Sequence, residues 1–266
     1  MKKSIVTFLG GLSVLSLFLI ATPAYANHSW GNYHWARTTS SFTLSLGDNV
    51  TSLWDARLGA ASADWSQSAV LDTVVVPGQA KGNCQPTKGR VEVCNKAYGN
   101  NGWLGIASIW ANGNHITQGT VKLNDTYFNS AKYNTLAWRQ LVACQEIGHT
   151  FGLNHQDENF SNANLGTCMD YTNDPDGALY NQLSNTKPNQ HDYDQLVTIY
   201  THLDSLTTLA ASAFGSAASA AAKDIDTGNP AEWGRVVRES SDGHGSLFER
   251  DLGHGDKLFT FVTWAN

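Results

Sequence analysis

The sequence predicts an α+β protein, because short stretches with the two-residue periodicity of strands lie among longer stretches with the spacing of amphipathic helices. Residues 41–46 alternate Phe and Leu with Ser and Thr, which is a strand pattern. Residues 50–67 and residues 135–151 instead repeat apolar side chains at helical spacing. Strands and helices that occur in such separate runs are typical of an α+β core.

The upstream half of the chain predicts a sheet with one helix against it. Asp48 and Asn49 can cap the helix at residues 50–67. The apolar positions of this helix are Val50, Leu53, Trp54, Leu58, Ala61 and Trp65. Further strands are expected at residues 70–76, 90–95, 102–110 and 116–124.

The first 26 residues have the pattern of a secretory signal. Two lysines form a basic start, residues 8–20 form an apolar run, and Ala24-Tyr25-Ala26 is a small-x-small cleavage site. A transmembrane anchor is the alternative, but the apolar run is shorter than the ~20 residues that a span needs, and glycines interrupt it. We therefore expect a secreted, extracellular mature chain that begins at Asn27 and has no membrane span.

Charge and size narrow the classes of function. The formal net charge is −6, and the sequence has no stripe of Lys and Arg that could neutralise nucleic-acid phosphates. The mature chain is long enough for one domain of ordinary size with an appendage. We expect a monomer that does not bind nucleic acid.

The helix predicted at residues 135–151 has polar side chains at one end of its apolar face. Its apolar face runs from Trp138 and Val142 into Gln145 and His149. Burying an amide and an imidazole costs free energy unless they have partners. A metal ion is a partner that two side chains four residues apart can share.

Gly152 and His155 extend this polar face beyond the helix. Glycine allows the left-handed conformation that ends a helix, so the chain can turn back and bring His155 to the same place as His149. A hydrogen-bonded core residue is the simpler interpretation of a single histidine. The combined spacing of Glu146, His149, Gly152 and His155 favours a metal site instead.

Residues 144–155, Cys-Gln-Glu-Ile-Gly-His-Thr-Phe-Gly-Leu-Asn-His, resemble the metzincin zinc-protease signature HExxHxxGxxH, with Gln145 in place of the first metal-binding histidine. Residues 167–171, Thr-Cys-Met-Asp-Tyr, resemble the Met-turn of that superfamily, with Met169 as its methionine. The resemblance covers about residues 40–202 and is matrixin-like. It implies a metzincin-like zincin fold, with a twisted mixed sheet, an active-site helix, a Met-turn and a C-terminal helix.

The resemblance also implies a secreted zinc-dependent metalloendopeptidase with one catalytic Zn2+. Gln145, His149 and His155 would hold the ion. Glu146 would be the general base that activates the attacking water. Tyr171 stands where the astacin-like and serralysin-like branches carry a tyrosine that ligates the metal or stabilises the tetrahedral intermediate. The sequence does not identify calcium ligands.

The amide of Gln145 leaves a second interpretation open. An amide oxygen is a weaker zinc ligand than imidazole, so the chain could be a catalytically weak or inactive metzincin relative that binds peptides or proteins. In both interpretations the partner is a polypeptide that binds as an extended strand along a sheet edge. Residues 116–124 are the expected edge, and a solvated edge without a partner is the alternative.

Four cysteines in a secreted chain predict two disulfides, and the sequence alone allows three pairings. Cys84 with Cys94 would close a short loop. Cys144 with Cys168 would tie the metal-binding helix to the Met-turn, so this pair of bridges is favoured. Metal binding by the cysteines is disfavoured because no CxxC element is present.

The C-terminal part of the chain divides by composition. A matrixin-like catalytic domain at residues 27–204 would end with a helix that begins near Asn189 or Gln190. Residues 205–226 are rich in Ala and Ser and predict a linker. Residues 227–266 contain two or three strand patterns and form a small β-rich segment, to which the sequence assigns no chemistry.

Overall fold

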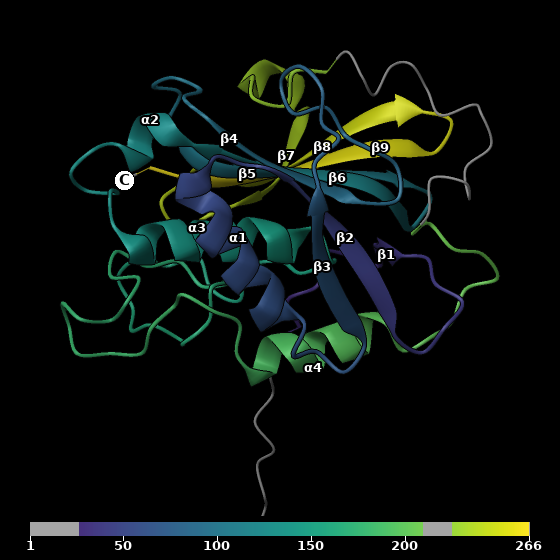
Figure 1. Ribbon diagram of the computed structural model, residues 1–266, viewed down its shortest axis with the longest axis horizontal. Coiled ribbons are helices and arrows are strands. Elements are labelled where there is room, and N and C mark those ends of the chain that lie inside the picture. Colours follow the sequence, from purple (N-terminus) through teal and green to yellow (C-terminus); the bar gives the residue numbers. More distant parts are fainter. Residues whose placement is uncertain (1–26, 210–224, 266) are drawn as a thin grey trace, which may run out of the picture.

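The computed structural model describes residues 27–209 and 225–265 of the chain. The signal predicted at residues 1–26 and the central part of the linker predicted at residues 205–226 lie outside the described residues. The described chain combines one large mixed sheet with a few helices (Figure 1). This arrangement confirms the predicted α+β class.

The elements follow one another along the chain in the order that the sequence predicts. The strands are β1 (His34–Trp35), β2 (Phe42–Asn49), β3 (Leu71–Pro77), β4 (Val91–Lys96), β5 (Trp103–Asn112), β6 (His115–Asn124), β7 (Arg235–Glu239), β8 (Gly245–Gly253) and β9 (Asp256–Trp264). The helices are α1 (Ser52–Trp65), α2 (Asp125–Phe128), α3 (Leu136–His149), α4 (Gln190–Ile199) and the short 3-10 helix η3 (Pro230–Glu232). Within the described ranges, none of these helices is long and apolar enough to cross a membrane.

The sheet joins the two ends of the chain. Its strand order is β3-β2-β4-β6-β5-β9-β8-β7, and β1 pairs with the start of β6. Strands β3, β2, β4 and β6 run parallel to one another, and β5 is antiparallel to β6. Strands β9, β8 and β7 continue the sheet beyond β5 in antiparallel pairs. The C-terminal part, for which the sequence predicts two or three strands, forms β7, β8 and β9, and these belong to the same sheet as the upstream half.

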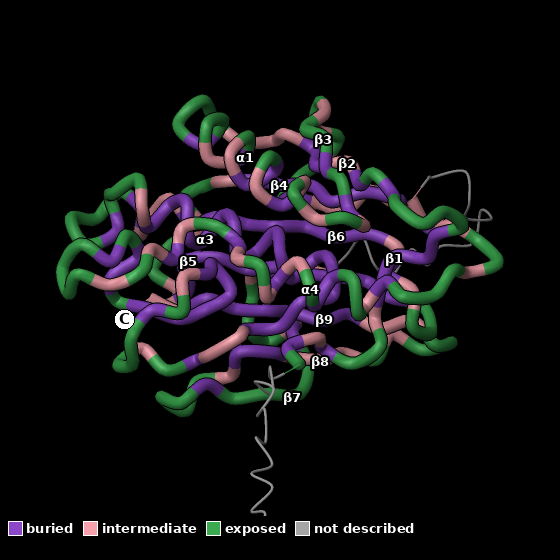
Figure 2. Tube along the Cα trace, turned by 90° about the horizontal axis from the view of Figure 1, so that it is seen from below, coloured by how far each residue is buried: buried purple, intermediate pink, exposed green. Residues whose placement is uncertain are grey.

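The expectation that residues 116–124 form the sheet edge is wrong. Strand β6 has β4 on one side and β5 on the other, so neither of its sides is free along this stretch. The outer strands of the upstream half are β3 on one side and β5 on the other, and β9 pairs with the outer side of β5 over nearly its whole length. Figure 2 shows these central strands as buried, whereas β7 at the end of the sheet is exposed.

Helices α1 and α3 pack on one another against the sheet, and this contact positions the segment that resembles the metzincin signature. Trp65, at the end of α1, is fully buried, and its indole Nε1 donates to the carbonyl of Cys144 in α3, 3.1 Å away. The side chain of Thr135 caps the start of α3 by accepting from the backbone N–H of Trp138. The motif helix is thus fixed at its N-terminus and along its length.

Both predicted disulfides are present. Cys84 is bonded to Cys94, and Cys144 is bonded to Cys168, which ties α3 to the segment that resembles the Met-turn. Helix α4 begins after Asn189, as predicted, and the side chain of Asp192 completes a capping box with that residue. Two disulfides agree with an oxidising, extracellular compartment.

Lys122 is a buried cation on β6, beside the C-terminal strands. Its Nζ lies 3.6 Å from Asp226 Oδ1. Burial lowers the pKa of Lys122 to about 8, although Asp226 offsets part of the effect. Below that pH the lysine is charged in the folded and the unfolded chain, so its burial costs about 3 kcal/mol. Between about pH 8 and pH 10.5, which is the ordinary pKa of lysine, the folded chain has lost this proton and the unfolded chain still holds it. The free energy of unfolding therefore increases over this range.

The variant Lys122→Met is therefore expected to raise the free energy of unfolding near pH 7 by up to about 3 kcal/mol. It should also remove the increase in stability between neutral and alkaline pH. Urea unfolding near pH 7 and near pH 10 measures both effects. If the variant keeps the alkaline increase of the parent protein, Lys122 is not its source.

Candidate metal centre

The structure brings His149 and His155 together. His149 is the last residue of α3, and Gly152 follows it with φ +104°, the left-handed conformation that the sequence predicts. A Cβ at Gly152 would lie 2.7 Å from the carbonyl oxygen of Tyr33, so this position has no room for a side chain. The turn places the Nε2 atoms of His149 and His155 2.9 Å apart, with the two rings nearly perpendicular.

The hydrogen bonds of the two Nδ1 atoms fix the tautomers. His149 Nδ1 lies 2.8 Å from the carbonyl oxygen of Leu153, which only accepts, so Nδ1 carries the proton. His155 Nδ1 lies 2.6 Å from Glu158 Oε1. Burial alone would raise the pKa of Glu158, but the hydrogen bond and charge of His155, together with Arg238, hold the pKa below its ordinary value.

When the ring of His155 is neutral, both Nε2 atoms present lone pairs to the same buried point. His149 and His155 are almost completely buried. Burial, and the neighbouring His155, hold the pKa of His149 well below its ordinary value, so this ring is neutral at physiological pH. Two opposed lone pairs repel one another unless a cation lies between them, and neutral imidazoles with Nδ1 partners are typical zinc ligands. The donor pair fits a divalent metal ion.

Glu146 lies on α3 beside this pair and is fully buried. Burial raises the pKa of Glu146 to about 8, while Thr263 and Ala107 offset part of the effect. Its carboxyl group fits against Gly105 of β5, where a Cβ would lie 2.8 Å from Glu146 Oε1. In this arrangement the carboxyl group is protonated at neutral pH.

Strand β9 covers the site. The ring of Phe261 stacks on the ring of His149, with centroids 4.0 Å apart and an interplanar angle of 9°. The hydroxyl of Tyr171 donates to the carbonyl oxygen of Val262, 3.2 Å away. The hydroxyl of Thr263 donates to Gln145 Oε1, 2.5 Å away. Three successive residues of the C-terminal strand thus contact the predicted site residues.

Gln145 has other partners than the two histidines. Its Nε2 donates to the carbonyl of Cys168, 2.9 Å away, and its Oε1 accepts from Thr263. The amide is buried within the same site, and its oxygen, the atom that would bind a metal, is in a hydrogen bond with β9.

Met169 and Tyr171 lie close to the histidines, on the segment bonded to α3 by a disulfide. A Cβ at Gly148, next to His149, would lie 2.6 Å from the Sδ of Met169. The rings of Tyr171 and His155 have centroids 4.5 Å apart. Burial raises the pKa of Tyr171 well above its ordinary value, so the phenol remains a hydrogen-bond donor. Met169, Tyr171, His149 and His155 are therefore neighbours, and Gln145 and Glu146 lie on the same helix as His149.

The sequence interpretation missed two parts of this site. Glu158, which orients His155, follows it by three residues in a loop, and an acidic side chain at that spacing is the signal that could have identified it. The contacts of Phe261, Val262 and Thr263 have no local signal, because their partners lie about a hundred residues or more away in the sequence.

No protein-family model matches the sequence, and no curated protein matches it. Among solved structures, the chain is similar to high choriolytic enzyme 1, a hatching enzyme zinc-protease from Oryzias latipes, the medaka fish. The two share 11% sequence identity, the TM-score is 0.34, and the match covers 63% of this chain and 94% of that chain.

Proposed function

We propose that this protein is a secreted metal-dependent endopeptidase whose cleft is filled by its own C-terminal strand. The observation that carries the proposal is the close approach of the buried His149 and His155, whose Nε2 atoms are 2.9 Å apart, with the buried Glu146 one turn earlier on α3. A pair of neutral imidazoles and a buried acid is the donor set of a catalytic metal site.

His149 and His155 would hold Zn2+, with Gln145 Oε1 as the third protein ligand once it exchanges the hydroxyl of Thr263 for the ion. When bound, the ion would supply Lewis acidity and a lowered pKa for water. His155 is held in place by Glu158, and His149 by the carbonyl of Leu153, so both rings are oriented before any ion arrives.

Glu146 and Tyr171 would move and hold protons. While β9 is in place, burial keeps Glu146 protonated. Departure of β9 would admit water, lower the pKa of Glu146 and produce the carboxylate that takes a proton from the attacking water. Tyr171 already donates to a backbone carbonyl, that of Val262, and would donate in the same way to the carbonyl of a substrate.

The substrate would be an extended polypeptide that pairs with β5. Strand β9 supports this proposal, because it is itself an extended segment in antiparallel register with β5, with Gly105 opposite Thr263 and Ala107 opposite Phe261. Backbone hydrogen bonds give such pairing its affinity without reading side chains. A substrate strand and β9 would therefore compete for one position.

The second candidate is a catalytically inactive relative that binds peptides or proteins. One observation favours it: the amide of Gln145 has a donor and an acceptor partner without any metal. A site that is satisfied in this way would need no ion to be stable. The difference in zinc content between the purified protein and its His149→Ala variant separates the two candidates. A loss of one ion for each chain supports the peptidase, and equal zinc contents support the inactive relative.

The variant Gln145→His tests the departure from the metzincin signature. We expect it to raise zinc affinity by about tenfold or more, because imidazole is a better zinc ligand than an amide oxygen. Zinc competition titrations and a peptidase assay measure the effect, with Gln145→Ala as the matched control. If affinity and activity increase together, Gln145 is a weak ligand. If the affinity does not change, position 145 is not part of the ligand set.

A further inference from the structure

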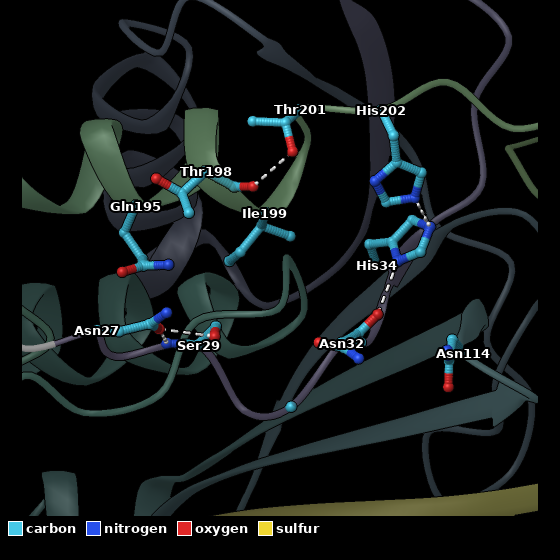
Figure 3. A pocket seen from close by; sticks show the side chains of 11 residues that line it. Asn27, Ser29, Asn32, His34, Asn114, Gln195, Thr198, Ile199, Thr201 and His202 are labelled. Carbon is cyan, nitrogen blue, oxygen red and sulfur yellow. Dashed lines mark hydrogen bonds between the residues drawn. The ribbon is translucent and has the colours of Figure 1, made fainter.

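A second group of histidines lies where β1, β6 and the segment after α4 meet. His34 of β1 stands opposite His115 of β6 in the parallel pair. His202 and Asp204 follow α4 and approach the same point. Figure 3 shows His34 and His202 facing one another at one end of a pocket. None of these four residues belongs to the site described above.

The side-chain ends converge on one oxygen atom. Asp204 Oδ1 lies 3.4 Å from His34 Nε2, 3.2 Å from His115 Nε2 and 3.7 Å from His202 Nε2. The Nε2 atoms of His34 and His202 are 3.2 Å apart. Four ligands about 2.0–2.1 Å from a tetrahedral zinc ion are about 3.3 Å from one another. The ligand atoms of His34, His115 and Asp204 lie close enough to one another to hold one metal ion. His202 approaches His34 and Asp204 from the side away from His115.

The hydrogen bonds of His34 and Asp204 to the surrounding backbone leave His34 Nε2 and Asp204 Oδ1 facing one another. His34 Nδ1 lies 2.8 Å from the carbonyl oxygen of Asn32, so Nδ1 carries the proton and Nε2 of the neutral ring has none. Such a ring cannot donate to Asp204 Oδ1, which it faces. The other oxygen, Asp204 Oδ2, accepts from the backbone N–H of Arg37, 3.0 Å away. His34 and Asp204 are themselves nearly buried. Backbone partners such as the carbonyl of Asn32 and the N–H of Arg37 orient metal ligands.

We propose that His34, His115 and Asp204 bind a structural Zn2+ ion, and that the exposed side chain of His202 turns in beside them as the fourth ligand. Three imidazoles and one carboxylate favour zinc over calcium or magnesium, which prefer oxygen ligands. Four protein ligands leave no position for water, which is the arrangement of a structural rather than a catalytic site. The ion would tie β1 and β6 to the segment that follows α4.

The same segment already contacts the start of the chain. The backbone N–H of Asp204 donates to the carbonyl of Arg37, and the backbone N–H of Thr208 donates to the carbonyl of Ala36. A metal ion at Asp204 would add a cross-link among three parts of the sequence that are far apart. Binding of zinc to the folded chain should therefore raise its stability.

Zinc content of the full chain with both His149→Ala and His155→Ala tests the proposal, because this double variant lacks the candidate catalytic ligands. After loading with zinc and desalting, we expect one zinc ion for each chain and a melting temperature that a chelator lowers. Adding His34→Ala should remove that ion. No retained zinc and no chelator effect on melting would overturn the proposal and would support a cluster held by protonated histidines alone.

The variant His202→Ala keeps the test decisive if loss of His34 prevents folding. His202 is 55% exposed, so its loss removes little packing. We expect zinc affinity at this site to fall by at least about tenfold, the size of effect that even outer partners of a metal site produce. His244→Ala is the matched control, since His244 is similarly exposed and lies in a distant turn. Equal zinc affinities in the two variants would exclude His202 as a ligand.

Discussion

Removal of the C-terminal strands, residues 225–266, is expected to raise peptidase activity by on the order of a hundredfold or more. Strand β9 pairs along β5 and lies over the candidate metal centre, so a substrate strand can bind only in molecules in which β9 has left. If about one molecule in a hundred is open, the apparent activity is reduced by that factor. A peptidase assay that compares the full-length and the shortened chain measures the difference.

Truncation could cause misfolding, because it exposes Trp103 and Ile106, which pack against Trp233 and Val262. A full-length variant with two substitutions in β9 is therefore the second test. The double variant Phe261→Ala with Thr263→Ala removes the contacts of β9 with His149 and Gln145 and leaves the other strands intact. It should raise activity in the same direction. Val236→Ala, at an exposed position of β7, is the control and should change nothing.

Two results would count against this account of β9. A full-length protein that cleaves substrates as fast as the shortened one would mean that β9 does not obstruct the cleft. A folded, zinc-loaded, shortened protein that binds unfolded polypeptides without cleaving them would identify the chain as a binding module.

The variant Glu146→Ala is expected to lower the peptidase activity of the opened protein by about 10²- to 10⁴-fold, the usual contribution of a general acid–base residue. Glu146 would take the proton of the attacking water. It is the only acidic residue of α3, the helix that also carries His149. Zinc content should remain that of the parent protein, because Glu146 is not a ligand. Activity and metal content measured on one preparation check both statements.

Glu158→Gln provides the contrasting variant. Glu158 acts through His155, so its loss should weaken zinc binding by about 10- to 100-fold. At saturating zinc, most of the activity should return, which a change at Glu146 does not allow. If Glu146→Ala and Glu158→Gln respond to zinc in the same way, the roles assigned to the two carboxyl groups are wrong.

Local sequence signals predicted much of the fold. The periodicity of residues 135–151 predicted α3, Asn189 was a correct cap for α4, and the glycine at position 152 predicted the turn that brings His155 to His149. These features depend on neighbours within a few residues. The favoured disulfides were also correct, and Cys144–Cys168 joins two segments that the resemblance had already placed together.

The long-range pairing of strands was beyond such signals. Strand β5 is buried on both faces and has no alternation that marks a free side, so the sequence could not indicate that it, rather than β6, lies at the outer side of the upstream strands. Pairing of β5 with β9 joins residues about 150 positions apart and depends on the global packing. The partner of Gln145 Oε1 was hidden for the same reason, because Thr263 reaches it only through that pairing.

Anomalous diffraction at the zinc absorption edge, from crystals grown with zinc, tests the central claim most directly. The account predicts a peak between Nε2 of His149 and Nε2 of His155, whether or not the cluster around Asp204 gives a second one. Well-ordered density in which the two rings face one another with no peak between them would contradict it.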